Sequence, residues 1–315
     1  MKTFYKLDDI PSDFGPSLVS VGNFDGVHRA HVRVLRAIVA RARDRRAKSI
    51  AVTFEPHPMR ILRPDAAPKL LTPTSEKLRL LETTGIDAAL VVPFTRDLSL
   101  MPPRDFVARI LCEKLQALEA HEGYNFRFGH KAAGDVKLLQ QLGDELGFEL
   151  VIYPEMCLRG LSVSSTRIRE LVREGDVRRA RYLLGRAFSI QSLAGRGRGY
   201  GSKYTVPTIN LSRYDELVPR DGVYVTRTRV GQECFDSVTN VGNRPTFGSD
   251  SFAIESHLLN FHPLKVTAET EIEVYFLYRL RDEIKFSSVE MLREQITRDV
   301  GKAQRYFALT QARLL

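Results

Sequence analysis

The sequence predicts an α/β protein in two parts: a parallel β-sheet covered by helices, then a small antiparallel β-barrel with a C-terminal helix. Three observations support this fold class. Short apolar runs alternate with amphipathic helical patterns in the first half, closely spaced Gly, Pro, Asp and Asn divide short strands in the second half, and helical spacing returns at the end of the chain. Because 315 residues exceed one typical domain, we expect two domains. The change from helices rich in Leu and Arg to short strands near residues 184–186 places them at residues 1–184 and 185–315.

The first domain contains short apolar strands separated by helical patterns. Apolar residues recur at helical spacing from Arg29 to Arg46, for example. The expected strands are residues 18–21, 50–54, 88–93, 117–121 and 149–153. Ligands bind beyond the carboxyl ends of strands in such sheets. Four motifs follow these ends, at residues 22–31, 55–58, 125–129 and 164–169, so we expect one composite site there.

The first of these motifs places two histidines at a helix start. Gly22 and Gly26 permit the sharp turn that joins a strand to a helix, and His28 and His31 lie three residues apart on the first helical turn. Free N–H groups and the helix dipole make such a turn an anion site, where two imidazoles can stabilise charge on a phosphoryl group. The alternative is an ordinary turn with two surface histidines.

The other motifs of this half also have two interpretations each. The hydroxyls before Arg169 can cap a helix while Arg169 reaches phosphate oxygens, or the motif is a plain N-cap with a surface arginine. Asn125 contacts a ligand or only caps its loop, and Arg127 has a structural alternative. His57, between two prolines, lines the site or caps the strand.

The second domain reads as short strands with turns between them, which is typical of an antiparallel closed barrel. The expected strands are residues 188–194, 222–230, 233–241, 252–261 and 269–280. Apolar residues at helical spacing in 288–315 predict a helix that packs across the barrel. Residues 195–201 alternate glycine with other residues, which suits either a phosphate-binding loop or a flexible linker.

Composition favours a cytoplasmic protein. Three widely spaced cysteines predict a reduced compartment, and no apolar run is long enough to span a bilayer. The net charge of +9 raises a nucleic-acid-binding alternative. The densest basic stretch, residues 41–48, closes a predicted helix, where cations are favourable without any partner, so we expect no nucleic-acid partner. The oligomeric state is left open.

Eight motifs together resemble the bifunctional riboflavin kinase/FAD synthetase family of bacteria and occur in that family's order. They are GNFDGVHRAH from Gly22, FEPHP from Phe54, GYNFRFG from Gly123, VSSTRIR from Val163, PTIN from Pro207, PRDGVY from Pro219, NRPTF from Asn243 and ESHLL from Glu255. The resemblance implies a Rossmann-like nucleotidylyltransferase domain followed by a riboflavin kinase-like barrel. It further implies that riboflavin and ATP give FMN in the barrel, and that FMN and ATP give FAD and pyrophosphate in the sheet domain.

The resemblance also implies roles for individual residues. In the adenylyltransferase domain, His28 and His31 stabilise the transferring α-phosphoryl group and Asn125 contacts the flavin. The residues it implies at ATP there are Gly22, Phe24, Asp25, Ser165, Thr166 and Arg169. In the kinase domain, Glu255 is the general base that accepts the proton of the riboflavin hydroxyl. The residues implied for Mg²⁺ and ATP are Gly197, Gly199, Gly201, Thr208 and Asn210, with Thr208 and Asn210 holding the metal.

Three positions depart from the family pattern. Ala30 stands where Gly usually separates the two histidines, and Asn260 stands where Asp often follows the Leu-Leu pair. Residues 204–206 replace a Leu-Gly-Phe before Pro207, so the kinase loop lacks a glycine. One alternative is therefore an FAD synthetase with an impaired kinase barrel. Another is a nucleic-acid-binding or regulatory protein that retains the fold.

Overall fold

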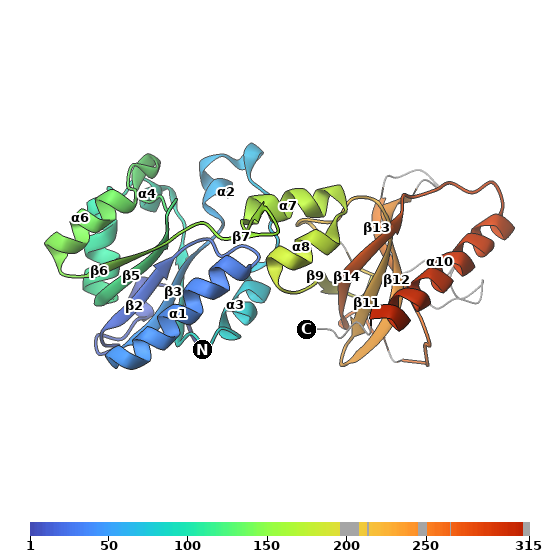
Figure 1. Cartoon of the computed structure of the whole chain (residues 1–315), viewed down its shortest axis with the longest axis horizontal. Helices are drawn as coiled ribbons and strands as arrows, with labels where there is room; N and C mark the ends of the chain where they lie inside the picture. Colours follow the sequence, from blue (N-terminus) through green and yellow to red (C-terminus); the bar gives the residue numbers. More distant parts are fainter. Residues whose placement is uncertain (196–207, 213, 245–250, 265, 311–315) are drawn as a thin grey trace. The chain divides into compact units, whose positions relative to one another are not determined.

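The computed structural model describes residues 1–195, 208–212, 214–244, 251–264 and 266–310, and its contacts form two compact units (Figure 1). The units are Met1–Ser165 and Thr166–Leu315. Helices α7 (Ser165–Glu174) and α8 (Val177–Leu184) lead into the second unit, where the amide of Arg220 donates to the carbonyl of Val172 at 3.3 Å. A domain boundary between residues 184 and 185 stays a prediction.

The first unit contains a parallel six-stranded sheet in the order β1-β4-β3-β2-β5-β6. Its strands are β1 (Lys2–Phe4), β2 (Ser17–Val21), β3 (Lys48–Glu55), β4 (Ala88–Pro93), β5 (Ala117–Gly123) and β6 (Glu149–Tyr153). A two-stranded ribbon follows, β7 (Cys157–Leu158) and β8 (Leu161–Ser162). All five predicted strands are confirmed to within a few residues. Strand β1 was missed, since its three residues gain their strand character from pairing with β4.

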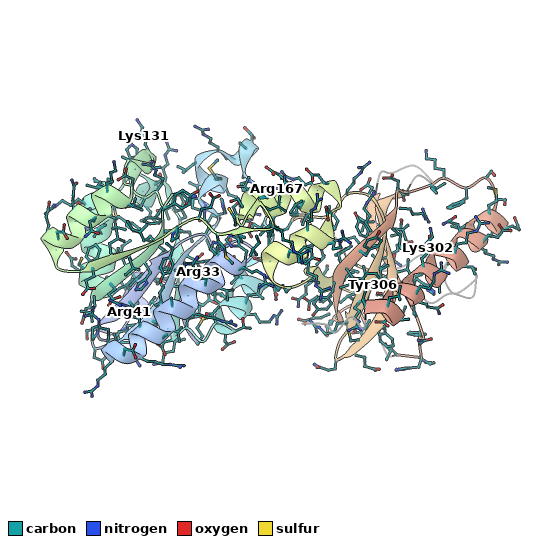
Figure 2. All side chains as sticks on the ribbon, viewed as in Figure 1. Arg33, Arg41, Lys131, Arg167, Lys302 and Tyr306 are labelled. Atoms are coloured by element: carbon teal, nitrogen blue, oxygen red, sulfur yellow. The ribbon has the colours of Figure 1, made fainter. Side chains whose placement is uncertain are left out.

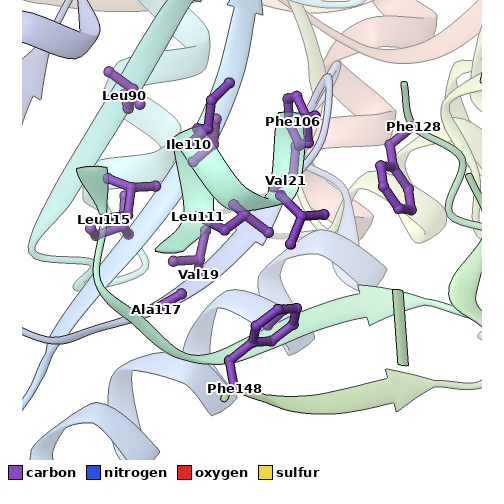
Figure 3. Close-up of a cluster of buried hydrophobic side chains, with 14 of the residues drawn as sticks. Val19, Val21, Leu90, Phe106, Ile110, Leu111, Leu115, Ala117, Phe128 and Phe148 are labelled. Carbon is purple, nitrogen blue, oxygen red and sulfur yellow. The ribbon is translucent and has the colours of Figure 1, made fainter. Parts of the chain in front are cut away.

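Helices cover both faces of this sheet. The α-helices are α1 (Arg29–Arg45), α2 (Pro58–Leu62), α3 (Thr74–Glu82), α4 (Arg96–Ser99), α5 (Pro103–Phe106) and α6 (Val136–Leu146); the 3₁₀ turns are Leu7–Asp9, Pro64–Ala66 and His130–Ala132, and Val107–Lys114 is a π-helix. Leu18 packs with Leu35 and Ile38 of α1 on one face. Val19 and Val21 point to the other face, where they join Phe106, Leu111, Phe148 and other side chains (Figure 3). The alternation along β2 therefore separates two cores.

The second unit contains an antiparallel six-stranded sheet in the order β10-β13-β12-β11-β14-β9. Its strands are β9 (Phe188–Leu193), β10 (Thr208–Asn210), β11 (Gly222–Val230), β12 (Glu233–Arg244), β13 (Ser251–Leu258) and β14 (Glu271–Arg281). The two edge strands meet beyond their ends, because Ala194 bridges Leu211 and the amide of Gly195 donates to the carbonyl of Asn210 at 2.8 Å. The predicted barrel is confirmed, and β10 was missed.

Helix α10 (Val289–Thr310) covers the outside of this barrel, as predicted. Its Ala303 packs with Val223 and Val225 of β11, and Tyr306 stacks on Tyr278 of β14 with ring centroids 5.8 Å apart. Strand β13 ends earlier than predicted, because Asn260 turns the chain with a φ of +53°, a conformation that Asn tolerates better than most residues.

A closed ring of five hydroxyls lies on the inner face of the barrel. The O···O separations are between 2.6 and 2.8 Å, and each hydroxyl has two partners in the ring. In order around the ring the residues are Thr226, Ser237, Thr228, Ser256 and Thr239. All five are fully buried. Since each O–H can donate once and accept once, the ring joins β11, β12 and β13 with every hydroxyl satisfied.

Replacing Thr226 by valine is expected to lower the free energy of unfolding of the second unit by about 1–3 kcal/mol. The change keeps the shape of the side chain, but Ser237 and Thr239 each lose a buried hydrogen-bond partner. Urea denaturation checks this, with Thr297→Val on the exposed side of α10 as the control. Equal stability of the two variants would contradict the expectation.

Candidate active sites

The turn after β2 carries the two predicted histidines to the start of α1. Gly26 has a φ of +81°, which suits glycine, and the Phe24 ring packs against Gly22. The Nδ1 atom of His28 accepts a hydrogen bond of 3.4 Å from the amide of His31, so His28 is the N-cap of α1. Ala30 lies in the first turn of the helix. The prediction that both histidines lie at the start of a helix is therefore confirmed.

The two imidazoles form a stacked pair. Their ring centroids lie 3.6 Å apart with an interplanar angle of 16°, and the Phe24 ring meets His31 edge-on at 5.2 Å. Burial, followed by the nearby His28 and Lys77, holds the pKa of His31 well below its usual range. His31 is therefore neutral at pH 7. A neutral imidazole has one N–H to donate, which suits a site that receives the anionic phosphates of a nucleotide.

Asp25 is buried and fastens a second segment to this turn. Its carboxylate accepts hydrogen bonds from the amide of Leu71, at 2.9 and 3.1 Å, and from the amide of Thr72, at 3.1 Å. The Thr72 hydroxyl in turn accepts from the amide of Gly26 at 3.1 Å. Asp25 thus holds the chain around residues 71–72 against the turn, and its predicted contact with ATP stays a prediction.

The variant Asp25→Asn is expected to destabilise the first unit by about 2 kcal/mol, because an amide presents N–H groups where two backbone donors need a charged acceptor. Chemical denaturation of the full chain measures this loss. Asp65→Asn, on the exposed turn after α2, is the control. Unchanged unfolding of the first unit would show that the carboxylate does not fasten the segment.

Ser165, the last residue of the first unit, contacts the histidine turn. Its hydroxyl donates to the carbonyl of Asp25 at 2.9 Å. Thr166 and the buried Arg169 belong to the second unit, so a clamp that combines them with the histidines stays a prediction. Asn125 lies exposed in the tight turn after β5, in which the amide of Phe126 donates to the carbonyl of Gly123 at 2.9 Å. Its amide group is accessible, while its flavin contact stays a prediction.

A buried carboxyl marks the place where β2 and β5 separate. The ladder between these strands extends from Ser17 to the pair Val19–Ala120, after which the amide of Val21 donates to the Glu122 carboxyl at 2.7 Å. Burial raises the pKa of Glu122 well above its usual range, which favours the neutral acid. Strand order reverses at this point of the sheet, so Glu122 stands at its switch point, where ligands of parallel sheets bind. Sequence reasoning missed Glu122, since a glutamate near the end of a strand is usually exposed.

Two other candidates have clear structural partners. The Nδ1 atom of His57 accepts from the amide of Met59 at 3.2 Å, so His57 caps α2. Arg127 pairs with Asp135, the N-cap of α6, at 3.4 Å. These contacts favour the structural interpretation of both residues.

The basic stretch that ends α1 also has partners within the first unit. Figure 2 shows Arg33 and Arg41 on this helix. Arg41 forms a very short contact with the buried Glu119 and a 3.3 Å contact with Glu149, and Arg45 lies 2.7 Å from Glu149. Carboxylates therefore balance part of the charge that raised the nucleic-acid-binding alternative.

In the second unit, the register of β10, β13 and β12 brings the predicted kinase residues together. Asn210 is directly opposite Glu255, which is in turn opposite Asn240. Thr208 is opposite His257. Because residues two apart on a strand share a face, these five side chains lie on one face of the sheet. Asn240 and His257 lie on predicted strands, but no role was assigned to them, because their place opposite the residues of β10 and beside Glu255 could not be predicted without β10.

Some predicted features fall outside the described residues. Gly197, Gly199 and Gly201 are among them, as is the stretch 204–206 before Pro207. In the described part of the chain no group of three or more His, Cys, Asp or Glu side chains is arranged to hold a metal ion. No helix among those residues is long and apolar enough to cross a membrane.

The fold and these sites define a class of protein: a nucleotide-binding parallel-sheet domain joined to a kinase-type barrel. An FAD synthetase profile matches residues 10–167, and a riboflavin kinase profile matches residues 184–307. The chain belongs to the bifunctional riboflavin kinase/FMN adenylyltransferase family. It therefore has the two activities of that family, formation of FMN from riboflavin and of FAD from FMN.

Individual relatives span nearly the whole chain. The bifunctional riboflavin kinase/FMN adenylyltransferase of Escherichia coli K12 is 32% identical over 295 residues, which cover 93% of this chain and 94% of the relative. That of Pseudomonas fluorescens is 33% identical over 288 residues, covering 91% and 92%. A solved structure described as a macrolide-efflux protein from Streptococcus pneumoniae is 26% identical, covers 96% of this chain and 98% of its own, and has a TM-score of 0.86.

Proposed function

We propose that FAD forms at the histidine turn of the first unit. An oxygen of the FMN phosphate attacks the α-phosphorus of ATP, and the bond to the leaving pyrophosphate breaks. The stacked His28 and His31 stand at the N-terminus of α1, so their N–H groups and the helix amides stabilise the charge on the α-phosphoryl group. This arrangement requires no protein nucleophile. Asn125 binds the flavin, and Ser165, Thr166 and Arg169 bind the phosphates of ATP.

FMN forms at the shared face of β10 and β13. Glu255 accepts the proton of the riboflavin 5′-hydroxyl as that oxygen attacks the γ-phosphorus of ATP, and ADP leaves. The observation that supports this role is the register, which sets Asn210 beside Glu255. The proposed base, Glu255, and a residue proposed to bind Mg²⁺ and ATP, Asn210, thus lie on neighbouring strands.

Mg²⁺ fits the same face. Thr208 and Asn210 lie two residues apart on β10 and present a hydroxyl and an amide oxygen, which are hard donors of the kind that Mg²⁺ accepts. When bound, Mg²⁺ neutralises charge on the phosphates of ATP. Small molecules are the substrates of both sites. A cytoplasmic location and the lack of a nucleic-acid partner stay predictions.

A time course of product formation tests the proposal. The full chain is incubated with riboflavin, ATP and Mg²⁺, and flavins are separated by chromatography. FMN should appear first and FAD second, and FMN supplied directly should become FAD. Conversion of FMN without any conversion of riboflavin would instead support the alternative of an impaired kinase barrel.

A further inference from the structure

Arg33 of α1 is an exposed arginine that lies over an aromatic ring of the same unit. Its guanidinium carbon is 5.9 Å from the ring centroid of Tyr153, the last residue of β6. A cation is attracted to the face of such a ring. Because β2 and β6 both pair in parallel with β5, the carboxyl end of β6 lies at the same edge of the sheet as the histidine turn. The guanidinium is therefore at the edge where ligands of parallel sheets bind.

A buried chain of hydrogen bonds fixes the Tyr153 ring. The phenol oxygen lies 3.0 Å from Nδ1 of His121, and Nε2 of His121 lies 3.0 Å from a carboxylate oxygen of Glu119. Glu119 is also paired with Arg45 at 2.9 Å and, more closely, with Arg41. Burial lowers the pKa of His121, which favours the neutral ring. Since the paired carboxylate only accepts, Nε2 carries the proton and Nδ1 accepts from the phenol. The orientation of the Tyr153 ring is thus set from inside the unit.

The hydrogen-bond donors of Arg33 are available. Within the described residues its guanidinium has no hydrogen bond or ion pair, and its contact with Tyr153 uses only the face of the ring. Five N–H donors in one plane suit the bidentate recognition of a phosphate group. Arg41 and Arg45 of the same helix differ in this respect, because they are paired with carboxylates.

The place of Arg33 on α1 complements that of the histidines. Arg33 follows His31 by two residues, so the two side chains point to different sides of the helix. His31 packs against the Phe24 ring of the turn, while Arg33 faces β6. Long helical side chains lean toward the N-terminus, where the helix amides attract anions. A phosphate group at the start of α1 would therefore have donors on two sides.

We propose that Arg33, held by the Tyr153 ring, is a further substrate-binding residue of the adenylyltransferase site and that it binds a phosphate group. The inference rests on the proposed role of the histidine turn. Both substrates carry phosphate: the β- and γ-phosphates of ATP leave as pyrophosphate, and the phosphate of FMN attacks. Tyr153 also joins the turn that bears Asn125, because its carbonyl accepts from the amide of Tyr124 at 2.9 Å. The KM for each substrate distinguishes the two sources of phosphate.

The test compares Arg33→Gln with the control Arg43→Gln, which removes the same charge from the exposed last turn of α1. KM and kcat of FAD formation are measured for FMN and for ATP separately, and calorimetric titration with each substrate gives the Kd. Arg33→Gln should raise the KM and Kd of the substrate whose phosphate it binds by about 10–100-fold. Its kcat should stay within about threefold of the wild type, since the contact forms before the reaction. Arg43→Gln should match the wild type.

Two further variants isolate the role of the ring. Tyr153→Phe and Tyr153→Leu both remove the hydroxyl that bonds His121, but only leucine removes the aromatic face. Tyr153→Leu should raise the same KM as Arg33→Gln, by about 3–30-fold, while Tyr153→Phe stays within about twofold. Adding Arg33→Gln should cost less in the leucine variant than in the phenylalanine variant, because the arginine is then already displaced.

The inference is wrong if Arg33→Gln has the same KM and Kd values as Arg43→Gln for both substrates. Equal effects of Tyr153→Phe and Tyr153→Leu would also overturn it, because the ring would then not hold the arginine. A wild-type chain that makes no FAD, or a His28 variant that still makes it at full rate, would instead contradict the proposed function.

Discussion

FAD formation is expected to fall about 10²–10³-fold in His28→Asn, while FMN formation keeps its wild-type rate. The imidazole of His28 stacks on His31 at the N-terminus of α1, where it can donate to the α-phosphoryl group in the transition state. Asparagine is chosen because it is a good N-cap, so α1 still begins at the same residue. The loss should appear in kcat rather than in the KM for ATP, since the donor acts mainly on charge that develops during the reaction.

His28→Ala provides the comparison for this result. Alanine removes both the donor and the cap that accepts from the amide of His31. FAD formation should therefore fall to a similar degree, and the free energy of unfolding should also fall by about 1 kcal/mol. If His28→Asn keeps full FAD formation while His28→Ala loses it, the residue serves the helix and not the reaction.

FMN formation is expected to fall about 10²–10⁴-fold in Glu255→Gln, with FAD formation from supplied FMN unchanged. Glutamine keeps the size of the side chain and its place opposite Asn210 and Asn240, but it cannot accept the proton of the riboflavin hydroxyl. Initial rates with riboflavin and ATP measure the kinase, and rates with FMN and ATP measure the adenylyltransferase in the same preparation.

Glu269→Gln, in the exposed turn before β14, is the control for Glu255→Gln. It removes one carboxylate from the same unit without touching the shared face of β10 and β13. A Glu255→Gln chain that phosphorylates riboflavin at the rate of this control would exclude Glu255 as the base. Parallel loss of both reactions would mean that the two sites are not separate.

Most of the fold could be predicted from the sequence, because the spacing of apolar residues along the chain indicates which side chains are buried. Strands β2 and β4 are mostly apolar and buried, and Gly22 and Gly26 permit the sharp turn that joins a strand to a helix. Strands β1 and β10 could not be predicted, since three residues carry too little pattern and gain their structure from a partner strand.

The buried polar groups of the sites could not be predicted for a different reason. Lys77 lies among helical residues of mixed polarity, where a lysine is usually exposed, and only the packing of α3 under the turn buries it. Thr226 and Thr228 alternate with apolar residues on β11 and read as an outward face. They are buried because they point into the barrel, where they join the hydroxyl ring. The valines on the other face of β11 pack with Ala303 of α10.

The closed hydroxyl ring of the barrel limits which single substitutions this chain can accept during evolution. If any one of the five side chains loses its hydroxyl, two neighbouring hydroxyls each lose a buried hydrogen-bond partner. If all five are exchanged for apolar residues of similar shape, no hydroxyl is left without a partner. Intermediate combinations are therefore less stable than either extreme, and the effects of single changes do not add. Ser256 directly follows Glu255, so we expect changes in the stretch that carries the proposed base to depend on its hydroxyl partners on β11 and β12.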